Sequence, residues 1–374
     1  MKLLIINPGS TSTKVSVYED ETKFFEESIF HDAPELLKYP HVNGQIPFRK
    51  SVILDFLKRH DVSLDEIDVF VGRGGSAVPC CSGVMEINEL LYEDTRDAKG
   101  GSEHPAKLGV MLAHELAKEC GKKAYTMDPT NVDELCDEAR LTGIKGVYRN
   151  AQAHVLNQKA VARKHCTLHE MKYKESNLII CHIDGGITVS AHHHGKMIDS
   201  NVGSGGDGAF TPTRIGSVPV MPLLDYIDAH STQDVRTMCS RSGGFVSYFG
   251  TSNFETIRER ALNHDEEADL IIRAMVYQIG KQIGSMAVVL KGKVDAILLT
   301  GGLSRYSEIV DPLKESCSWI SGIYVYPGEL EQEALALETL KALRGERPLL
   351  GYDGKPVFSG FDFIEEGEQD EQNS

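Results

Sequence analysis

The segment from Asn7 to Lys14, NPGSTSTK, contains the residue types that hold phosphate groups. A glycine, four hydroxyl side chains and a lysine follow directly on an apolar run. It is not a Walker A loop, because that motif has glycine before its lysine and leads into a helix. Here Thr13 precedes the lysine, and the next residues, VSVYED, alternate apolar and polar, which predicts a strand. We therefore expect a hairpin whose tip offers N–H groups and hydroxyls to phosphate oxygens, or else an ordinary Ser/Thr-rich hairpin.

A second segment, residues 177–199, repeats this pattern with an apolar strand, a glycine turn and an alternating strand. Its turn contains Asp184, Gly185 and Gly186, which correspond to the first turn about half a chain earlier. Repetition at this distance predicts two related lobes. A nucleotide held between two such lobes would meet both hairpin tips.

A third glycine turn favours the same interpretation. The segment DAILLTGGLS, residues 295–304, is predicted to be a buried strand that ends in Gly301 and Gly302. A long apolar segment, residues 269–290, precedes it and is typical of a helix. Glycines directly after a strand allow a ligand to approach the backbone closely. The order of the three turns along the chain is the informative feature, because a single Gly-Gly pair is common.

Composition excludes several classes of function. The chain has 374 residues, enough for two domains, and a formal net charge of −16. This charge argues against a nucleic-acid partner, which needs a basic surface. The eight cysteines show no metal-ligand spacing and fit thiols in a reducing cytoplasm. No apolar run is long enough to cross a membrane and no signal peptide is seen, so we expect a cytoplasmic location.

Several segments resemble a known family in order and spacing. NPGSTSTK is similar to the opening of carboxylate kinases, and the three turns resemble the superfamily of acetate and sugar kinases, heat-shock ATPases and actin. The resemblance narrows to butyrate kinases, within the acetokinase family, in further motifs: VGRGG at 71–75, YTMDPTNVDEL at 125–135, AHVLNQKAVAR at 153–163, DGAFTPTR at 207–214 and VYPGELEQEALALETLKALRGE at 325–346. It implies an α/β protein with two related lobes of actin-like ATPase (ribonuclease H-like) fold and a cleft between them.

The resemblance also implies an activity. It is the reversible transfer of the γ-phosphoryl group of ATP to a short-chain fatty acid, with butyrate first, which gives the acyl phosphate and ADP with Mg²⁺ as the metal. Isobutyrate, propionate and acetate remain alternative acids. A sugar kinase or an actin- or chaperone-like ATPase is a more distant alternative. The resemblance further implies a homo-oligomer, a dimer or larger.

The roles of individual residues follow from the same resemblance. Arg73 and Arg214 lie in glycine-bearing or polar segments, and a guanidinium can clamp a carboxylate or a phosphoryl group with two donors. The resemblance implies that Arg73 holds the acid and Arg214 the phosphoryl group. The other residues with implied roles are catalytic His182 and Asp128, substrate- and phosphate-binding Asn7, Ser10, Ser12, Lys14 and His154, and nucleotide-binding Gly185, Gly186, Gly301, Gly302 and Leu303.

Metal contacts are assigned to Asn7 and Glu329, with Glu331 or Glu333 as alternatives because carboxylates are crowded there. Asp128 would position magnesium through water, or would simply cap a following helix. Asp184 departs from the three glycines usual in the family and adds a carboxylate beside the expected phosphate. The run His192-His193-His194 lies in a predicted hairpin, where neighbouring side chains point to opposite faces, which disfavours a metal site.

The expected organisation has a first lobe at residues 1–170 that binds the acid and phosphate, and a second lobe at 175–328 that binds the nucleotide. The helix at 329–346 returns to the first lobe, and residues 360–374 form an acidic tail that is predicted to be disordered. A helix from Pro105 should end at Gly121, which suits a C-cap.

Overall fold

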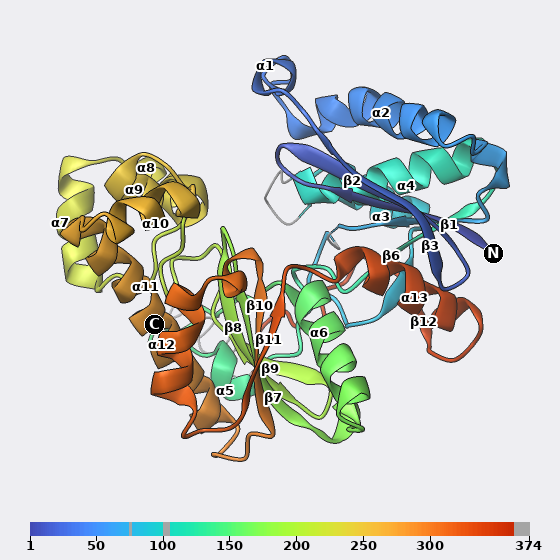
Figure 1. Ribbon diagram of the computed structural model, residues 1–374. Helices are drawn as coiled ribbons and strands as arrows, with labels where there is room; N and C mark the ends of the chain where they lie inside the picture. Colours follow the sequence, from blue (N-terminus) through green and yellow to red (C-terminus); the bar gives the residue numbers. More distant parts are fainter. Residues whose placement is uncertain (75–76, 100–104, 363–374) are drawn as a thin grey trace, which may run out of the picture. The chain divides into compact units, whose positions relative to one another are not determined.

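The computed structural model describes residues 1–74, 77–99 and 105–362, and the chain divides into two units (Figure 1). Unit 1 contains Met1–Asp133 and Leu330–Ser359, and unit 2 contains Glu134–Glu329 with residues 360–362. Residues 134–170, which the sequence analysis placed in the first lobe, therefore belong to unit 2. Most of the expected acidic tail lies outside the described residues, as does Gly75 of the VGRGG motif.

A seven-stranded sheet forms the centre of unit 1, with the strand order β12-β5-β6-β4-β1-β2-β3. β1 pairs antiparallel with β2 and parallel with β4, which in turn pairs parallel with β6. The hairpin predicted from NPGSTSTK is thus confirmed. The strands are β1 Lys2–Pro8, β2 Ser12–Glu19, β3 Thr22–Phe30, β4 Val69–Gly72, β5 Val84–Glu86, β6 Lys123–Met127 and β12 Leu349–Leu350.

Helices cover both faces of this sheet. α4 packs against β4 and β6, and α2 packs beside it against α4 and β2, whereas α13 packs against β1, β4 and β6 from the other face (Figure 1). α4 ends as predicted, because Gly121 adopts a φ of 64° that suits glycine. The helices of unit 1 are α1 Ala33–Leu36, α2 Ile46–Arg59, α3 Glu89–Arg96, α4 Leu108–Glu119 and α13 Glu331–Leu343.

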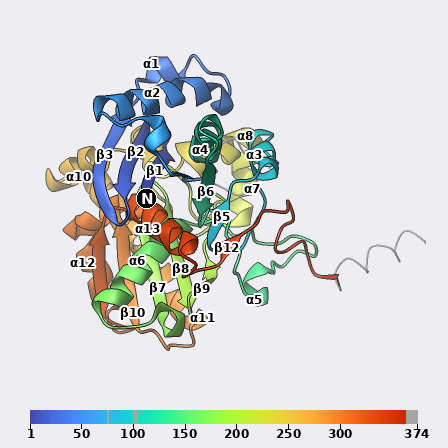
Figure 2. The same cartoon turned by 90° about the vertical axis from the view of Figure 1, so that its right-hand side faces the viewer.

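Unit 2 contains a five-stranded sheet with the order β11-β10-β7-β8-β9. β7 pairs antiparallel with β8 and parallel with β10, which pairs parallel with β11. α6 covers one face, and α11 with α12 covers the other (Figures 1 and 2). The strands are β7 Asn177–Ile183, β8 Ile187–His193, β9 Lys196–Ser200, β10 Ala296–Gly301 and β11 Ile323–Pro327.

The longest helix, α11, spans Glu266–Val289 and matches the apolar segment predicted to be helical. The other helices of unit 2 are α5 Asp137–Arg140, α6 Val155–Leu168, α7 Val220–Ala229, α8 Thr232–Thr237, α9 Phe245–Phe249, α10 Phe254–Leu262 and α12 Ser307–Cys317. In the described part of the chain, no helix is both long and apolar enough to span a bilayer.

The two sheets repeat one design. The order β3-β2-β1-β4-β6 in unit 1 matches β9-β8-β7-β10-β11 in unit 2, with the same parallel and antiparallel pairings. β1 and β7 are apolar almost throughout because each lies in the interior of its sheet with both faces covered. The predicted duplication and the predicted α/β fold class are therefore both confirmed.

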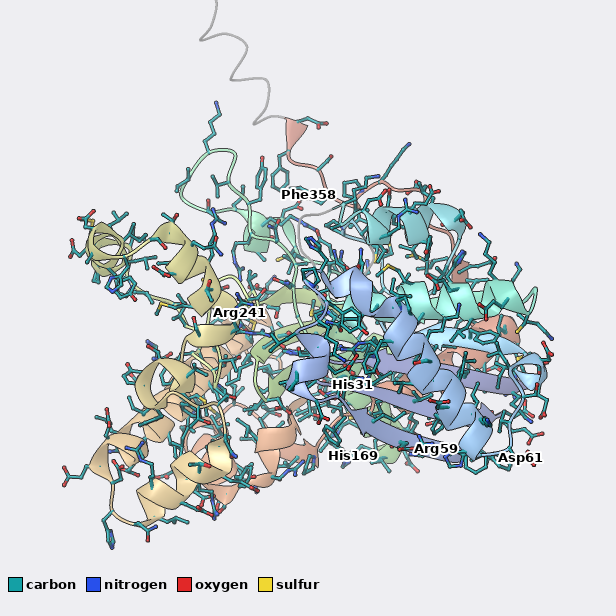
Figure 3. The ribbon with its side chains drawn as sticks, turned by 90° about the horizontal axis from the view of Figure 1, so that it is seen from above. His31, Arg59, Asp61, His169, Arg241 and Phe358 are labelled. Atoms are coloured by element: carbon teal, nitrogen blue, oxygen red, sulfur yellow. The ribbon has the colours of Figure 1, made fainter. Side chains whose placement is uncertain are left out.

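A buried arginine supports the tip of the first hairpin. The Arg49 side chain on α2 is fully buried, and its guanidinium donates to the carbonyls of Gly9 at 2.9 Å and Ser12 at 2.8 Å. It also donates to Thr13 Oγ1 at 3.0 Å, and Thr13 contacts His31, which packs edge-on against a ring of α2 (Figure 3). Burial lowers the pKa of Arg49 to about 10. This arginine supplies a donor to the Gly9 carbonyl and a second donor to the Ser12 carbonyl, which also accepts from the Gly9 N–H at 2.8 Å.

We predict that Arg49→Leu lowers the free energy of unfolding by roughly 2–4 kcal/mol, because the hairpin-tip carbonyls and the buried Thr13 hydroxyl lose a charged donor. Urea unfolding followed by circular dichroism measures this loss. Arg59→Leu is the matched control, since Arg59 lies on the same helix in a half-exposed ion pair with Glu27 and should change stability by less than about 1 kcal/mol. Equal losses in the two variants would contradict the supporting role of Arg49.

Candidate functional site

The residues singled out in the sequence gather at one edge of each sheet. In unit 1, Asn7, Arg73 and Asp128 lie at the carboxyl ends of the parallel strands β1, β4 and β6. In unit 2, His182, Gly301 and Glu329 lie at the carboxyl ends of the matching strands β7, β10 and β11. Ligands of open α/β sheets bind at this edge, so each unit presents one candidate half-site.

In unit 1, Glu331 ties two predicted residues together. Its Oε2 accepts from Asn7 Nδ2 at 2.9 Å and lies 3.0 Å from Arg73 Nε. The Glu331 side chain is almost fully buried at the first turn of α13, and its Oε1 has no hydrogen-bond partner among the described residues. Glu331, one of the two alternatives to Glu329, is therefore the carboxylate beside Asn7, whereas Glu329 belongs to unit 2.

Two glycines, Gly72 and Gly109, let α4 pack closely against the end of β4, and this contact positions Arg73. The Arg73 N–H donates to the carbonyl of Ile6 at 2.8 Å, which continues the pairing of β1 with β4. A Cβ added at Gly109 would lie 1.9 Å from the Arg73 carbonyl oxygen, and one at Gly72 would lie 2.0 Å from the Gly109 oxygen. α4 can therefore contact the strand end only because both positions are glycine.

Asp128 is fixed inside unit 1. Its Oδ1 accepts from Ser82 Oγ at 2.6 Å and from the Gly83 N–H at 2.9 Å, and its own backbone has a φ of 40°. The alternative role as a helix cap is wrong, because the residues directly after Pro129 are not helical and the next helix, α5, begins at Asp137. The two bonds hold the carboxylate at the strand edge.

Ser10, Ser12 and Lys14 of the first hairpin are accessible, whereas Thr13 is buried. Ser10 at the tip is exposed, and Ser12 and Lys14 are half-buried. Lys14 lies opposite Asn7 in the β1–β2 pairing, which puts both side chains on one face. Lys14 Nζ lies 3.6 Å from Glu26, an ion pair that is open to solvent.

In unit 2, Asp184 links the two glycine turns. Its Oδ1 accepts from the Gly185 N–H at 2.8 Å and its Oδ2 accepts from the Gly302 N–H at 2.6 Å. Gly301 has a φ of 90° and lies so close to Ile183 that a Cβ would approach the Ile183 oxygen to 2.4 Å. Asp184, where the family usually has glycine, therefore accepts hydrogen bonds from the N–H groups of Gly185 and Gly302. The sequence had led us to expect that both glycines bind the nucleotide. Leu303, also assigned there, is buried.

Arg214 lies directly against the second of these turns. A Cβ added at Gly186 would be 2.6 Å from Arg214 Nη1 and 2.8 Å from Cζ, so the guanidinium occupies the space beside this glycine. Its Nη1 donates to the Gly203 carbonyl, while its buried Nε has no partner among the described residues. Burial lowers the pKa of Arg214, and no carboxylate of the described chain forms an ion pair with it. A guanidinium in this state is suited to bind an anion.

Two hydroxyl groups that the sequence analysis missed hold the arginine in place. Thr211 Oγ1 and Thr213 Oγ1 donate to the Gly185 carbonyl at 2.7 and 2.8 Å, and the Arg214 N–H donates to Thr211 Oγ1 at 3.0 Å. Gly244, with a φ of 57°, packs where a Cβ would meet the Thr211 oxygen at 1.6 Å. The Thr-Pro-Thr-Arg segment at 211–214 is the sequence feature that could have indicated these two hydroxyl groups.

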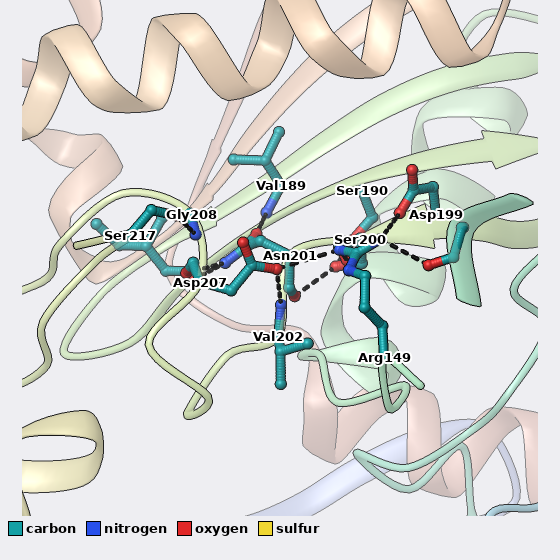
Figure 4. A network of polar contacts seen from close by, with 12 residues as sticks. Arg149, Val189, Ser190, Asp199, Ser200, Asn201, Val202, Asp207, Gly208 and Ser217 are labelled. Carbon is teal, nitrogen blue, oxygen red and sulfur yellow. Dashed lines mark hydrogen bonds and ion pairs between the residues drawn. The ribbon is translucent and has the colours of Figure 1, made fainter. Parts of the chain in front are cut away.

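The loop that carries Gly203 is held by a polar network (Figure 4). Arg149 donates to Asp199 at 3.0 Å and Asp207 at 3.1 Å, and Asp207 also accepts from the Val202 N–H at 3.1 Å. Asn201 Oδ1 accepts from the Val189 N–H at 2.7 Å and so joins the loop to β8. The network fixes the carbonyl that receives Arg214.

The two predicted histidines lie together in unit 2. The rings of His154 and His182 stack with centroids 3.8 Å apart and planes 10° apart. His182 is buried, and its Nε2 lies 3.8 Å from Glu329 Oε1. Ligand atoms of His182, Asp184 and Glu329 lie within 4.8 Å of one another, the one such group in the described chain that could hold a metal ion. The run His192–His194 is not part of it.

Comparison with known proteins agrees with this geometry. Acetate kinase from Porphyromonas gingivalis has 20% identity and a TM-score of 0.69 over 91% of this chain and 99% of its own. Propionate kinase from Francisella tularensis subsp. tularensis has 18% identity and a TM-score of 0.69 over 90% and 98%. Acetate kinase from Entamoeba histolytica has 16% identity and a TM-score of 0.71 over 91% and 99%. These similarities show the fold.

The repeated sheets and these neighbours define a two-lobed protein of the actin-like ATPase fold. The model of the acetokinase family matches residues 138–330, more than half of the chain. The chain therefore belongs to the acetokinase family of carboxylate kinases.

We predict that Gly186→Ala lowers turnover with ATP and a short-chain acid by about 100-fold, because the new methyl group must displace the Arg214 guanidinium. Steady-state kinetics measure this effect. Gly284→Ala is the control, since nothing lies within 4 Å of a Cβ at that helical position, and it should leave turnover unchanged. Near-normal turnover in Gly186→Ala would show that the close contact with Arg214 is not needed.

Proposed function

We propose that the chain transfers the γ-phosphoryl group of ATP reversibly to a short-chain fatty acid, with butyrate as the leading candidate, and forms the acyl phosphate and ADP. The main support for this proposal is the environment of Arg214. It is a half-buried cation that lies against the Gly185-Gly186 turn, and no carboxylate of the described chain pairs with it. Phosphoryl transfer depends mainly on positioned cations and donors that stabilise charge on the moving group.

The acid substrate needs no general base in this reaction. A fatty carboxylate, with a pKa of about 4 to 5, is already ionised at neutral pH and can attack phosphorus directly. The physical difficulty is the repulsion between this anion and the triphosphate. Arg214 in unit 2 and Arg73 in unit 1 would reduce it, with Arg214 on the phosphoryl group and Arg73 on the carboxylate.

The remaining contacts divide between the units. In unit 1, Asn7, Ser10, Ser12 and Lys14 offer donors to phosphate. In unit 2, the glycines at 185–186 and 301–302 would let the nucleotide approach the backbone closely, although the N–H groups of Gly185 and Gly302 already donate to Asp184. His182 would offer a donor, and His154 holds His182 by stacking. Pairing with Glu331 engages only Nε of Arg73, and a guanidinium has four further N–H donors for an anion.

The residues around Glu331 fit a magnesium ion. Mg²⁺ prefers one or two carboxylates, several waters and phosphate oxygens. Glu331 supplies a buried carboxylate whose Oε1 has no partner in the described chain. Asn7 and Asp128 lie at the carboxyl ends of β1 and β6, which flank β4 in the same sheet. When bound, the ion would neutralise charge on the phosphates. Glu331 would hold it, with Asn7 beside it and Asp128 acting through water.

Two other functions, a sugar kinase and an ATPase that works by shape change, have weaker support. A sugar kinase needs a carboxylate that is placed as a general base, whereas Asp128 is held by Ser82 and Gly83 within unit 1. An ATPase that works by shape change would leave the arginine of the VGRGG motif without a role. Among acids, the resemblance of the segments at 125–135 and 153–163 to butyrate kinases favours butyrate over isobutyrate, propionate and acetate.

The direct test is to trap acyl phosphate with hydroxylamine in the presence of ATP and Mg²⁺, using acetate, propionate, butyrate and isobutyrate in turn. We expect the highest kcat/KM with butyrate. Arg214→Ala should lower turnover at least 100-fold, whereas Arg241→Ala, at an exposed arginine labelled in Figure 3, should not change it. ATP consumption without acyl phosphate, or phosphorylation of a sugar instead, would refute the proposal.

The metal assignment has its own test in three substitutions, Glu329→Gln, Glu331→Gln and Glu333→Gln. We predict that Glu331→Gln raises the Mg²⁺ concentration for half-maximal activity about 10-fold or more, because it removes the buried carboxylate. Glu333 is exposed and serves as the neighbouring comparison. The assignment fails if Glu329→Gln or Glu333→Gln shifts the Mg²⁺ requirement more than Glu331→Gln does.

A further inference from the structure

A buried asparagine on α6 contacts the ring of His182. Asn157 is fully buried, and its Nδ2 lies 2.9 Å from His182 Nδ1 and 3.2 Å from Thr300 Oγ1. It lies in the AHVLNQKAVAR segment, and the proposed reaction gives it no role. The direction of the surrounding hydrogen bonds determines which atom of the amide faces the histidine.

Thr300 sets this direction. Its hydroxyl donates to the Gly328 carbonyl at 3.0 Å, and a carbonyl oxygen can only accept. The single Thr300 proton is thereby used, so Thr300 Oγ1 must accept from the Asn157 amide. The NH₂ group of Asn157 therefore faces both Thr300 Oγ1 and His182 Nδ1, and the reversed amide would place two acceptor oxygens against each other.

Because His182 Nδ1 accepts this bond, the one proton of the neutral ring lies on Nε2. We propose that Asn157 is a positioning residue that holds His182 as the Nε2–H tautomer, so that His182 donates a hydrogen bond to an anionic oxygen of the substrate. The inference rests on the proposed function for the identity of that anion, a phosphoryl oxygen. An Nε2 atom that carries a proton has no lone pair for a metal or for general-base chemistry.

This tautomer changes the interpretation of the cluster formed by His182, Asp184 and Glu329. The three ligand atoms lie within 4.8 Å of one another, which resembles a metal site. The His182 atom that faces Glu329 is Nε2, at 3.8 Å, and in the proposed tautomer this atom is a donor. The cluster is therefore arranged to present an N–H group beside two carboxylates, and His182 is not a metal ligand.

The neighbouring histidine is held in the same way. Gln158 Nε2 donates to the Thr188 carbonyl at 3.2 Å and to Thr188 Oγ1 at 2.9 Å. Thr188 Oγ1 also accepts from the His154 backbone N–H at 3.4 Å, so its proton is directed to His154 Nδ1 at 2.9 Å. Two consecutive amides, Asn157 and Gln158, thus direct both stacked rings to carry the proton on Nε2.

The test is a two-bond ¹H–¹⁵N correlation spectrum of the full-length chain labelled with ¹⁵N-histidine, recorded near pH 8, above the usual histidine pKa of about 6.5. The His182 signals are identified by their loss in His182→Gln. We expect His182 to show the pattern of the Nε2–H tautomer. The Nδ1–H pattern in the wild-type chain would overturn the inference, and this measurement needs no variant at Asn157 to fold.

A substitution at Asn157 tests whether this residue determines the tautomer of His182. In Asn157→Asp the carboxylate can only accept, so the proton should move to Nδ1 and turnover should fall about 10- to 100-fold. Asn177→Asp is the matched control, because Asn177 Oδ1 lies 2.7 Å from His193 Nδ1 at an exposed position outside the site. It should change neither the His182 signals nor turnover. An unchanged His182 pattern in Asn157→Asp would refute the role of Asn157.

The two failures can be told apart. If the chain forms no acyl phosphate but His182 shows the Nε2–H pattern and loses it in Asn157→Asp, the positioning inference holds and the proposed function fails. If acyl phosphate forms but His182 is the Nδ1–H tautomer, the inference fails and the function holds.

Discussion

The contact between Arg214 and Gly186 is the interaction on which the site depends. A guanidinium that loses water on burial is destabilised unless an anion compensates it, and the described chain supplies no carboxylate for Arg214. The contact requires a glycine at 186, two threonines that fix the segment at 211–214, and a loop carbonyl at Gly203 that Arg149 helps to hold. In a chain with a net charge of −16, such local cations decide where an anion can bind.

The repeated sheet explains why each unit has a half-site at the same edge. Parallel strands β1, β4 and β6 end together in unit 1, and β7, β10 and β11 end together in unit 2. The equivalent edges now differ in chemistry. Unit 1 presents Arg73, Asn7 and Glu331, whereas unit 2 presents glycine turns, His182 and Arg214. One repeated design thus provides two different sets of candidate anion-binding side chains.

Local patterns in the sequence predicted the elements that local physics determines. Period-two alternation after Lys14 gave the hairpin, the apolar run at 269–290 gave α11, and Gly121 marked the end of α4. The glycine turns were also visible because three of them follow in order along the chain, whereas the arginines were singled out by the family resemblance of their segments.

The contacts that the sequence did not predict are those made between distant segments. Arg49 lies on a helix with a charged neighbour at each turn and is indistinguishable from a surface residue, yet it is fully buried under the hairpin tip. Glu329, Glu331 and Glu333 alternate along one segment, and only the fold shows that Glu331 contacts Asn7. The roles of Asn157 and Asp184 likewise depend on hydrogen bonds with Thr300 and Gly302, which lie more than a hundred residues away in the sequence.

The most direct test of the account is a crystal structure of the full chain with Mg²⁺ and a non-hydrolysable ATP analogue. We expect the terminal phosphate beside the Gly185-Gly186 turn, with the Arg214 guanidinium and His182 Nε2 within hydrogen-bond distance of its oxygens. A triphosphate bound away from both glycine turns of unit 2, with Arg214 still bonded only to the Gly203 carbonyl, would contradict it.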